Sequence, residues 1–117
     1  MPAALPAAVA EALDRFAGAV RERFGDRVRE IVLFGSHARG EATEDSDVDV
    51  LVAIDDLSHE ERLEVLDVAY AADSFTAGAA DELVGLSPLA YSTAQATRLR
   101  SGGRRLLRDI DREGVRL

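Results

Sequence analysis

The chain has 117 residues, the size of one ordinary domain, and we expect residues 1–117 to form a single domain around one core. Its net charge of −8 disfavours duplex nucleic acid as a partner, and the absence of cysteine excludes disulfides and thiolate metal sites. All 14 basic residues are arginine, which excludes mechanisms that need a lysine nucleophile or a P-loop lysine.

The first segment of the chain is apolar, but it has no basic start, and Glu11 and Asp14 interrupt it. We therefore expect neither a targeting segment nor a membrane span, and with the absence of cysteine this favours a cytoplasmic location. Apolar residues recur every three or four positions from about residue 7 to residue 24. This spacing predicts an amphipathic helix that ends at Gly25.

Two apolar runs predict strands on either side of a polar segment. Residues 28–34 are rich in β-branched and aromatic side chains and end abruptly at Gly35, which predicts a strand. Residues 47–54 continue into an unbroken apolar run, which is typical of a buried strand. The polar residues 36–46 between the two strands predict a short turn and helix.

The rest of the chain predicts a helix, a third strand and two shorter helices. Ser58 and Glu61 stand in a capping-box arrangement, which predicts the start of a helix. Residues 82–92 look like a strand in which Pro88 lies near an edge or a bend. The end of the chain has helical character on both sides of a glycine pair at 102–103.

The residues with the clearest chemistry stand where the first strand ends and the second begins. Gly35 lets the backbone approach a ligand closely, and Ser36 adds a hydroxyl to free backbone N–H groups, which suits a phosphate. Asp47 and Asp49 point to the same face of a strand, so their carboxylates can share a hard cation such as Mg²⁺. The two halves meet at one edge of the sheet if the strands are antiparallel, which the short connection allows.

Other motifs fit the same residues less well. The spacing of Gly35 and Gly40 is that of a P-loop, but the lysine and the hydroxyl residue that should follow are missing. An EF-hand beginning at Asp45 would need glycine where Val50 stands. An ordinary strand end and a solvated acidic loop explain either half alone, whereas carboxylates inside the start of an apolar strand favour a site.

Gly35-Ser36, ten residues and then Asp47-x-Asp49 resemble the signature of the DNA polymerase β-like nucleotidyltransferase superfamily, in particular its minimal, single-domain prokaryotic members. The likeness extends to residues 87–89 and 113–115, so it covers nearly the whole chain. It implies an α/β fold with a small mixed sheet of about three strands flanked by helices, similar to the polymerase β palm.

The resemblance also implies a reaction. Asp47 and Asp49 would bind two Mg²⁺ ions, and Gly35 and Ser36 would hold the β- and γ-phosphates of a nucleotide such as ATP. An acceptor hydroxyl would attack the α-phosphate and pyrophosphate would leave. Minimal members are often encoded beside a HEPN-type protein in toxin–antitoxin pairs, and some transfer AMP to a tyrosine of that partner.

Two further residues near the motif are less specific. The planar guanidinium of Arg39 suits a phosphate, and an ion pair with Glu41 or Glu44 explains it equally well. We expect His37 to face solvent or to serve the loop rather than catalysis.

The resemblance breaks at a third carboxylate, which the family usually places on a later strand. Gly85 stands at that position here, so Glu82 or Asp81 replaces the missing ligand, or the ligand is absent. The alternative function is therefore a nucleotide-binding antitoxin module that neutralises its partner by contact, without turnover. Restoring the acid by Gly85→Asp should speed transfer, provided that position 85 does not need a positive φ.

Overall fold

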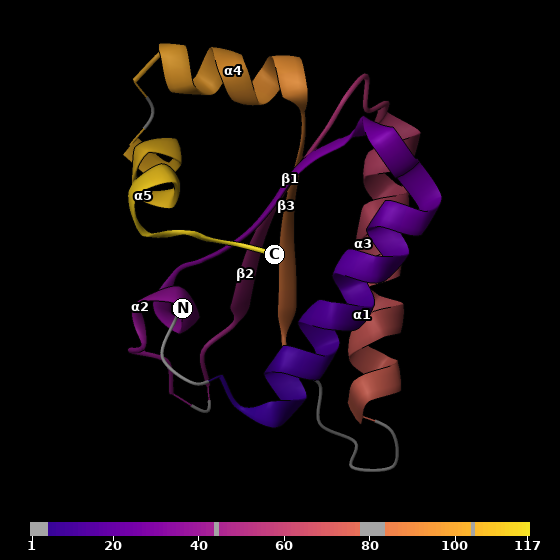
Figure 1. Ribbon diagram of the computed structural model, residues 1–117, viewed down its shortest axis with the longest axis vertical. Coiled ribbons are helices and arrows are strands. Elements are labelled where there is room, and N and C mark those ends of the chain that lie inside the picture. The colour runs from indigo at the N-terminus through magenta and orange to yellow at the C-terminus, as the bar shows by residue number, and fades with distance from the viewer. Residues whose placement is uncertain (1–4, 44, 78–83, 104) are drawn as a thin grey trace.

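The computed structural model describes residues 5–43, 45–77, 84–103 and 105–117. None of the helices in these ranges is long and apolar enough to cross a membrane. In chain order the elements, labelled as in Figure 1, are α1 (Ala7–Phe24), η1 (Gly25–Arg27), β1 (Val28–Phe34), α2 (Ser36–Arg39), β2 (Val48–Ile54), α3 (His59–Ala77), β3 (Leu86–Ser92), α4 (Thr93–Ser101), α5 (Arg105–Glu113) and β4 (Val115–Arg116).

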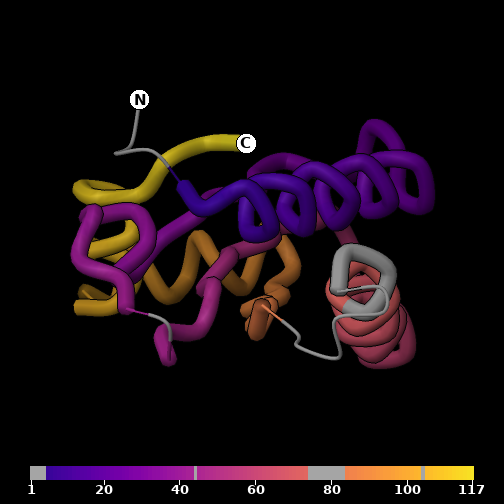
Figure 2. The backbone as a smooth tube through the Cα atoms, turned by 90° about the horizontal axis from the view of Figure 1, so that it is seen from below, coloured from indigo at the N-terminus to yellow at the C-terminus, as the bar shows by residue number. Residues whose placement is uncertain are grey.

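The strands form one mixed sheet in the order β3-β2-β1-β4. β1 pairs antiparallel with β2 and β4, whereas β2 and β3 are parallel and are connected through α3. α1 and α3 lie side by side against the sheet, and α4 and α5 lie away from them (Figures 1 and 2). The predicted α/β fold, a small mixed sheet flanked by helices, is confirmed.

Successive side chains of β2 pack into two different cores, which explains why its apolar run is unbroken. Val50 and Val52 belong to the core formed with α1 and α3, whereas Leu51 belongs to a second core with Leu107 and Ile110 of α5. All three β2 residues are fully buried. A strand covered on both faces needs apolar side chains on both, so β2 is apolar at every position from Val50 to Ile54.

Three elements differ from the sequence prediction. β4 was not predicted, because a strand of two residues carries no pattern and forms only by pairing with Val32 and Leu33 of β1. α3 runs on to Ala77, beyond the predicted end near residue 73. β3 begins at Leu86 rather than at residue 82, and Gly85 has a φ of +83°, which is not a strand conformation. Asp81 and Glu82 lie outside the described residues.

The start of α3 confirms the predicted capping box. The Ser58 hydroxyl accepts a hydrogen bond from the Glu61 N–H at 3.1 Å, and the Glu61 carboxylate accepts one from the Ser58 N–H at 3.0 Å. Arg27 donates two further hydrogen bonds to Glu61, at 2.7 and 2.9 Å. Hydrogen bonding from Arg27 first, and then from the Ser58 backbone, lowers the pKa of Glu61 to about 2.

We expect Glu61→Gln to lower the melting temperature at neutral pH and the difference to shrink in acid. A lowered folded-state pKa means that ionised Glu61 stabilises the fold above its ordinary pKa of 4.5 and that this contribution is lost as the pH falls toward about 2. Thermal melts of both proteins across this range measure the effect. Glu60→Gln, on the neighbouring exposed carboxylate, is the control, and a difference for Glu61→Gln that is independent of pH would contradict the assignment.

Candidate functional site

The antiparallel pairing of β1 and β2 brings the two halves of the sequence motif together. Phe34, the last residue of β1, pairs with Asp49 near the start of β2, and Gly35 follows at once. Gly35 has φ +77° and ψ −155°, a conformation that is essentially restricted to glycine. A Cβ at this position would lie 2.5 Å from Asp49 Oδ2, so only glycine lets the chain pass this close to the carboxylate.

Ser36 opens the single turn of α2. The turn is closed by the Arg39 N–H bonding to the Gly35 carbonyl at 3.2 Å and by the Glu41 N–H bonding to the Ser36 carbonyl at 2.9 Å. Gly40 ends it in the left-handed conformation. No side chain caps the start of α2, so its first backbone N–H groups are suited to an anionic ligand.

Asp47 and Asp49 form the acidic half of the site. Asp47 is exposed just before β2, and Asp49 is half-buried on the strand. Burial, and then the negative charge of Asp47, raise the pKa of Asp49, while the charges of His37 and Arg39 act in the opposite direction. The ionised pair is therefore disfavoured in the bare protein, and a hard divalent cation held by both carboxylates would relieve this. The donor set fits such an ion.

The structure places the two neighbouring basic residues differently from one another. Arg39 is exposed and bonds to Glu41 at 3.2 Å and to Glu113 at 3.4 Å, so the ion-pair alternative holds in this structure, while Glu44 lies outside the described residues. His37 is only 6% exposed, so the expectation that it faces solvent is wrong. His37 lies in the single turn of α2, which is in contact with β1 and β2.

β3 lies beside the acidic half of the site. Its parallel register aligns Leu86 with Val48 and Ser87 with Asp49, and the Val48 N–H donates to the Gly85 carbonyl at 2.9 Å. A Cβ at Gly85 would lie 3.2 Å from Asp47 Oδ1, so position 85 does face the acidic pair. Within the described residues, no cluster of three or more potential metal ligands occurs.

Sequence reasoning missed two residues at or next to β3. Ser87 is exposed and shares the register of Asp49, which only the parallel pairing reveals. Asp73 is 4% exposed and bonds to the backbone just before β3. The sequence did contain a signal for Asp73. This acidic residue follows the buried Ala72 by one position and the buried Ala69 by four, which places it on the buried face of α3.

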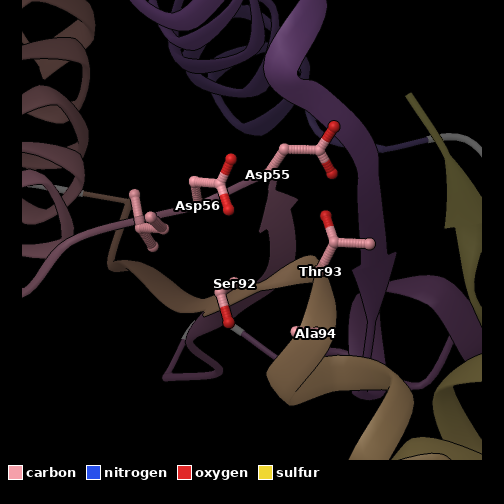
Figure 3. Close-up of a pocket in the computed structure, with 6 residues that line it drawn as sticks. Asp55, Asp56, Ser92, Thr93 and Ala94 are labelled. Carbon is pink, nitrogen blue, oxygen red and sulfur yellow. The ribbon is translucent and has the colours of Figure 1, made fainter.

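A separate hollow of about 490 Å³ lies at the opposite end of the sheet, where β2 and β3 end (Figure 3). Arg29 donates a hydrogen bond to Asp55 at 2.7 Å and thereby lowers the pKa of that carboxyl. The acidic side of this hollow is thus already engaged by an arginine, and the hollow contains neither half of the motif. It is lined by Asp55, Asp56, Leu57, Ser92, Thr93 and Ala94.

A known protein family matches the part of the chain that contains the motif. The family described as "Nucleotidyltransferase domain" matches residues 13–88, a range that includes Gly35, both aspartates and Gly85. The chain belongs to this family. The motif therefore lies within a nucleotidyltransferase domain.

Several relatives of this chain are protein adenylyltransferases by name. It is 63% identical over 38 residues to the protein adenylyltransferase MntA of Thermococcus cleftensis, a match covering 32% of this chain and 36% of the relative. It is 42% identical over 45 residues to a Methanocaldococcus jannaschii protein whose name assigns it to the same class, covering 38% and 45%. The matched segments thus span less than half the length of each relative.

A solved structure from Sulfolobus solfataricus, assigned as a nucleotidyltransferase, is a more distant likeness. The superposition covers 97% of this chain and 87% of the chain in that structure, with 14% identity and a TM-score of 0.44. At this level it adds nothing about the site.

The geometry at Gly85 reverses one expectation for this nucleotidyltransferase domain. Because Gly85 has a positive φ of +83°, the condition under which Gly85→Asp was expected to speed transfer is not met. An L residue there is strained by about 1–2 kcal/mol, and a carboxylate would also meet Asp47 as a like charge. We expect Gly85→Asp to melt at a lower temperature and to turn over no faster than the unmodified protein.

Gly85→Ala separates the two effects, because it carries the strain without the charge. Melting temperature and release of labelled pyrophosphate from ATP measure both variants. Acceleration of tenfold or more by Gly85→Asp would show that the backbone adapts and that the missing acid limits the rate.

Proposed function

We propose that this nucleotidyltransferase binds a nucleoside triphosphate with Mg²⁺, with ATP as the first choice, and transfers its nucleoside monophosphate to a hydroxyl acceptor. The close approach of Gly35 to the Asp49 carboxylate is the observation that carries the proposal, since it joins a phosphate-binding turn to a metal-binding pair. Gly35 and Ser36 would hold the β- and γ-phosphates. Asp47 and Asp49 would hold two Mg²⁺ ions.

In this reaction the chain itself forms no covalent bond to the nucleotide. The acceptor oxygen bonds to the α-phosphorus as the bond to the bridging oxygen breaks, and pyrophosphate leaves. Bound Mg²⁺ would supply neutralisation of charge on the phosphate and leaving oxygens. The chain orients the triphosphate by its backbone at Gly35 and Ser36, and Gly85 offers no carboxylate to take the acceptor's proton, which passes to water or to a base of the acceptor. General-base assistance contributes about a hundredfold to ten-thousandfold, so we expect slow transfer.

The acceptor we propose is a protein hydroxyl, because the named relatives are protein adenylyltransferases. Within that class we favour a tyrosine of a HEPN-type partner in a toxin–antitoxin pair, following the resemblance of the motif. The proposal treats residues 1–117 as one domain and places it in the cytoplasm, where ATP is available. Arg39 would join the phosphate contacts only by leaving Glu41 and Glu113.

Binding of Mg-ATP tests the first step of the proposal. A ligand that binds only the native state at about a hundred times its dissociation constant adds about 2.7 kcal/mol, a rise in melting temperature on the order of 10 °C for a domain of this size. We expect this rise with ATP and Mg²⁺ and its loss when EDTA is added. No shift with ATP, GTP, CTP or UTP in the presence of Mg²⁺ or Mn²⁺ would refute the binding site.

A second candidate function is a nucleotide-binding module that neutralises its partner by contact alone. The glycine at position 85, facing Asp47 where the family usually has an acid, favours it. Mass spectrometry of the co-purified partner separates the two: an added nucleoside monophosphate supports transfer, and an unmodified partner in a stable complex supports the contact mechanism.

A further inference from the structure

Asp73, near the end of α3, is a buried carboxylate with three backbone partners. It is 4% exposed and accepts hydrogen bonds from the N–H groups of three consecutive residues. Oδ1 accepts from Val84 at 2.6 Å, and Oδ2 accepts from Gly85 and Leu86, each at 3.0 Å. A buried carboxylate needs hydrogen-bond donors, and these three N–H groups supply them.

The segment that Asp73 holds is in contact with the acidic pair. Gly85 sits at a φ of +83°, and the position of its missing Cβ is 3.2 Å from Asp47 Oδ1. The Gly85 carbonyl accepts the Val48 N–H at 2.9 Å. Val48 is the residue between Asp47 and Asp49, so the backbone of the pair is joined to Asp73 through two successive hydrogen bonds.

We propose that Asp73 is a positioning residue for Asp47 and Asp49, acting through the backbone of residues 84–86. Its carboxylate fixes Gly85 in the left-handed conformation, and Gly85 then fixes Val48 and the wall beside Asp47. The effect on metal binding rests on the proposed function, whereas the effect on the backbone does not. Groups that orient metal ligands in this indirect way typically change metal affinity by about 10- to 100-fold when they are replaced.

Asp73→Asn is the informative substitution because it keeps the shape and removes one acceptor. Whichever way the amide is turned, its NH₂ group faces at least one of the three N–H donors, so the three bonds cannot all form. Asp73→Glu keeps both oxygens and displaces them by one methylene, and it is the second variant if Asp73→Asn does not fold. Val65→Ala, at a fully buried core position of the same helix, is the control for lost stability alone.

Two measurements on the full chain decide the proposal. The first is amide hydrogen exchange without metal or nucleotide: Asp73→Asn should accelerate exchange at Val48 relative to Val52 of the same strand, whereas Val65→Ala should change both alike. The second is titration with Mn²⁺ in the presence of ATP: Asp73→Asn, or Asp73→Glu in its place, should weaken Mn²⁺ binding by about tenfold or more, while Val65→Ala changes it by less than about twofold.

The outcomes separate this proposal from the proposed function. Unchanged relative exchange at Val48 overturns the positioning role, whatever the metal does. Selective exchange at Val48 with unchanged Mn²⁺ affinity overturns the link to the acidic pair. If the unmodified chain binds no Mn²⁺ with ATP, the proposed function fails, and the exchange at Val48 alone then confirms or overturns the role of Asp73 in holding the backbone.

Discussion

Replacing both aspartates, as Asp47→Asn with Asp49→Asn, should abolish metal-dependent nucleotide binding while the metal-free protein keeps or gains thermal stability. Burial and the neighbouring charge of Asp47 raise the pKa of Asp49. A raised folded-state pKa means that ionisation of Asp49 opposes folding above its ordinary pKa, and this opposition disappears once the side chains are neutral amides. The variant is therefore expected to lose metal-dependent nucleotide binding without losing stability.

The expected loss of turnover is more than about a thousandfold, since removing even one preorganised group that stabilises transition-state charge costs about a hundred- to a thousandfold. Melting temperature with and without Mg-ATP, together with turnover, measures both halves of the prediction. Asp26→Asn with Asp45→Asn changes the net charge equally at two exposed positions and is the control. Wild-type binding of Mg-ATP by the Asp47, Asp49 variant would show that the pair is not the metal site.

Gly35→Ala should be nearly as damaging, although it adds a single methyl group. The new Cβ would lie 2.5 Å from Asp49 Oδ2, closer than such atoms approach, so the carboxylate or the turn must move. The backbone conformation at Gly35 adds strain of about 1–3 kcal/mol for any other residue. We expect a lower melting temperature and loss of the Mg-ATP shift together, in contrast to the aspartate variant, which loses only the shift.

Gly18→Ala is the matched control for this substitution. Gly18 lies within α1, and a Cβ there meets nothing within 4 Å, so the change should be neutral or stabilising by up to about 1 kcal/mol. Thermal melts of both variants, with and without Mg-ATP, provide the comparison. An intact Mg-ATP shift in Gly35→Ala would contradict the close contact between the turn and Asp49.

The elements that could be predicted from the sequence are those with a local pattern. The helical spacing of apolar residues gives α1 with its observed ends, and the β-branched run ending at Gly35 gives β1. The capping box at Ser58 and Glu61 depends on three residues of separation and forms as predicted. The spacing of Gly35-Ser36 and Asp47-x-Asp49 predicted the two halves of the candidate site because each half is contiguous, and the structure brings the two halves together.

What could not be predicted depends on contacts between distant parts of the chain. Gly85 has a positive φ where its N–H donates to Asp73 and where an added Cβ would lie 3.2 Å from Asp47 Oδ1, and neither feature has a local signal in the sequence. The second partner of Arg39, Glu113, is 74 residues away. His37 is a polar residue, but it is buried in the turn of α2.

Transfer of label from ATP tests the central claim most directly. The chain, together with any protein that co-purifies with it, is incubated with Mg²⁺ and ATP labelled either at the α- or at the γ-phosphorus. We expect the α-label, and not the γ-label, to become covalently attached to protein, and the attachment to be lost in the Asp47→Asn, Asp49→Asn variant. Attachment of the γ-label, or α-label transfer that persists in that variant, would contradict nucleotidyl transfer at this site.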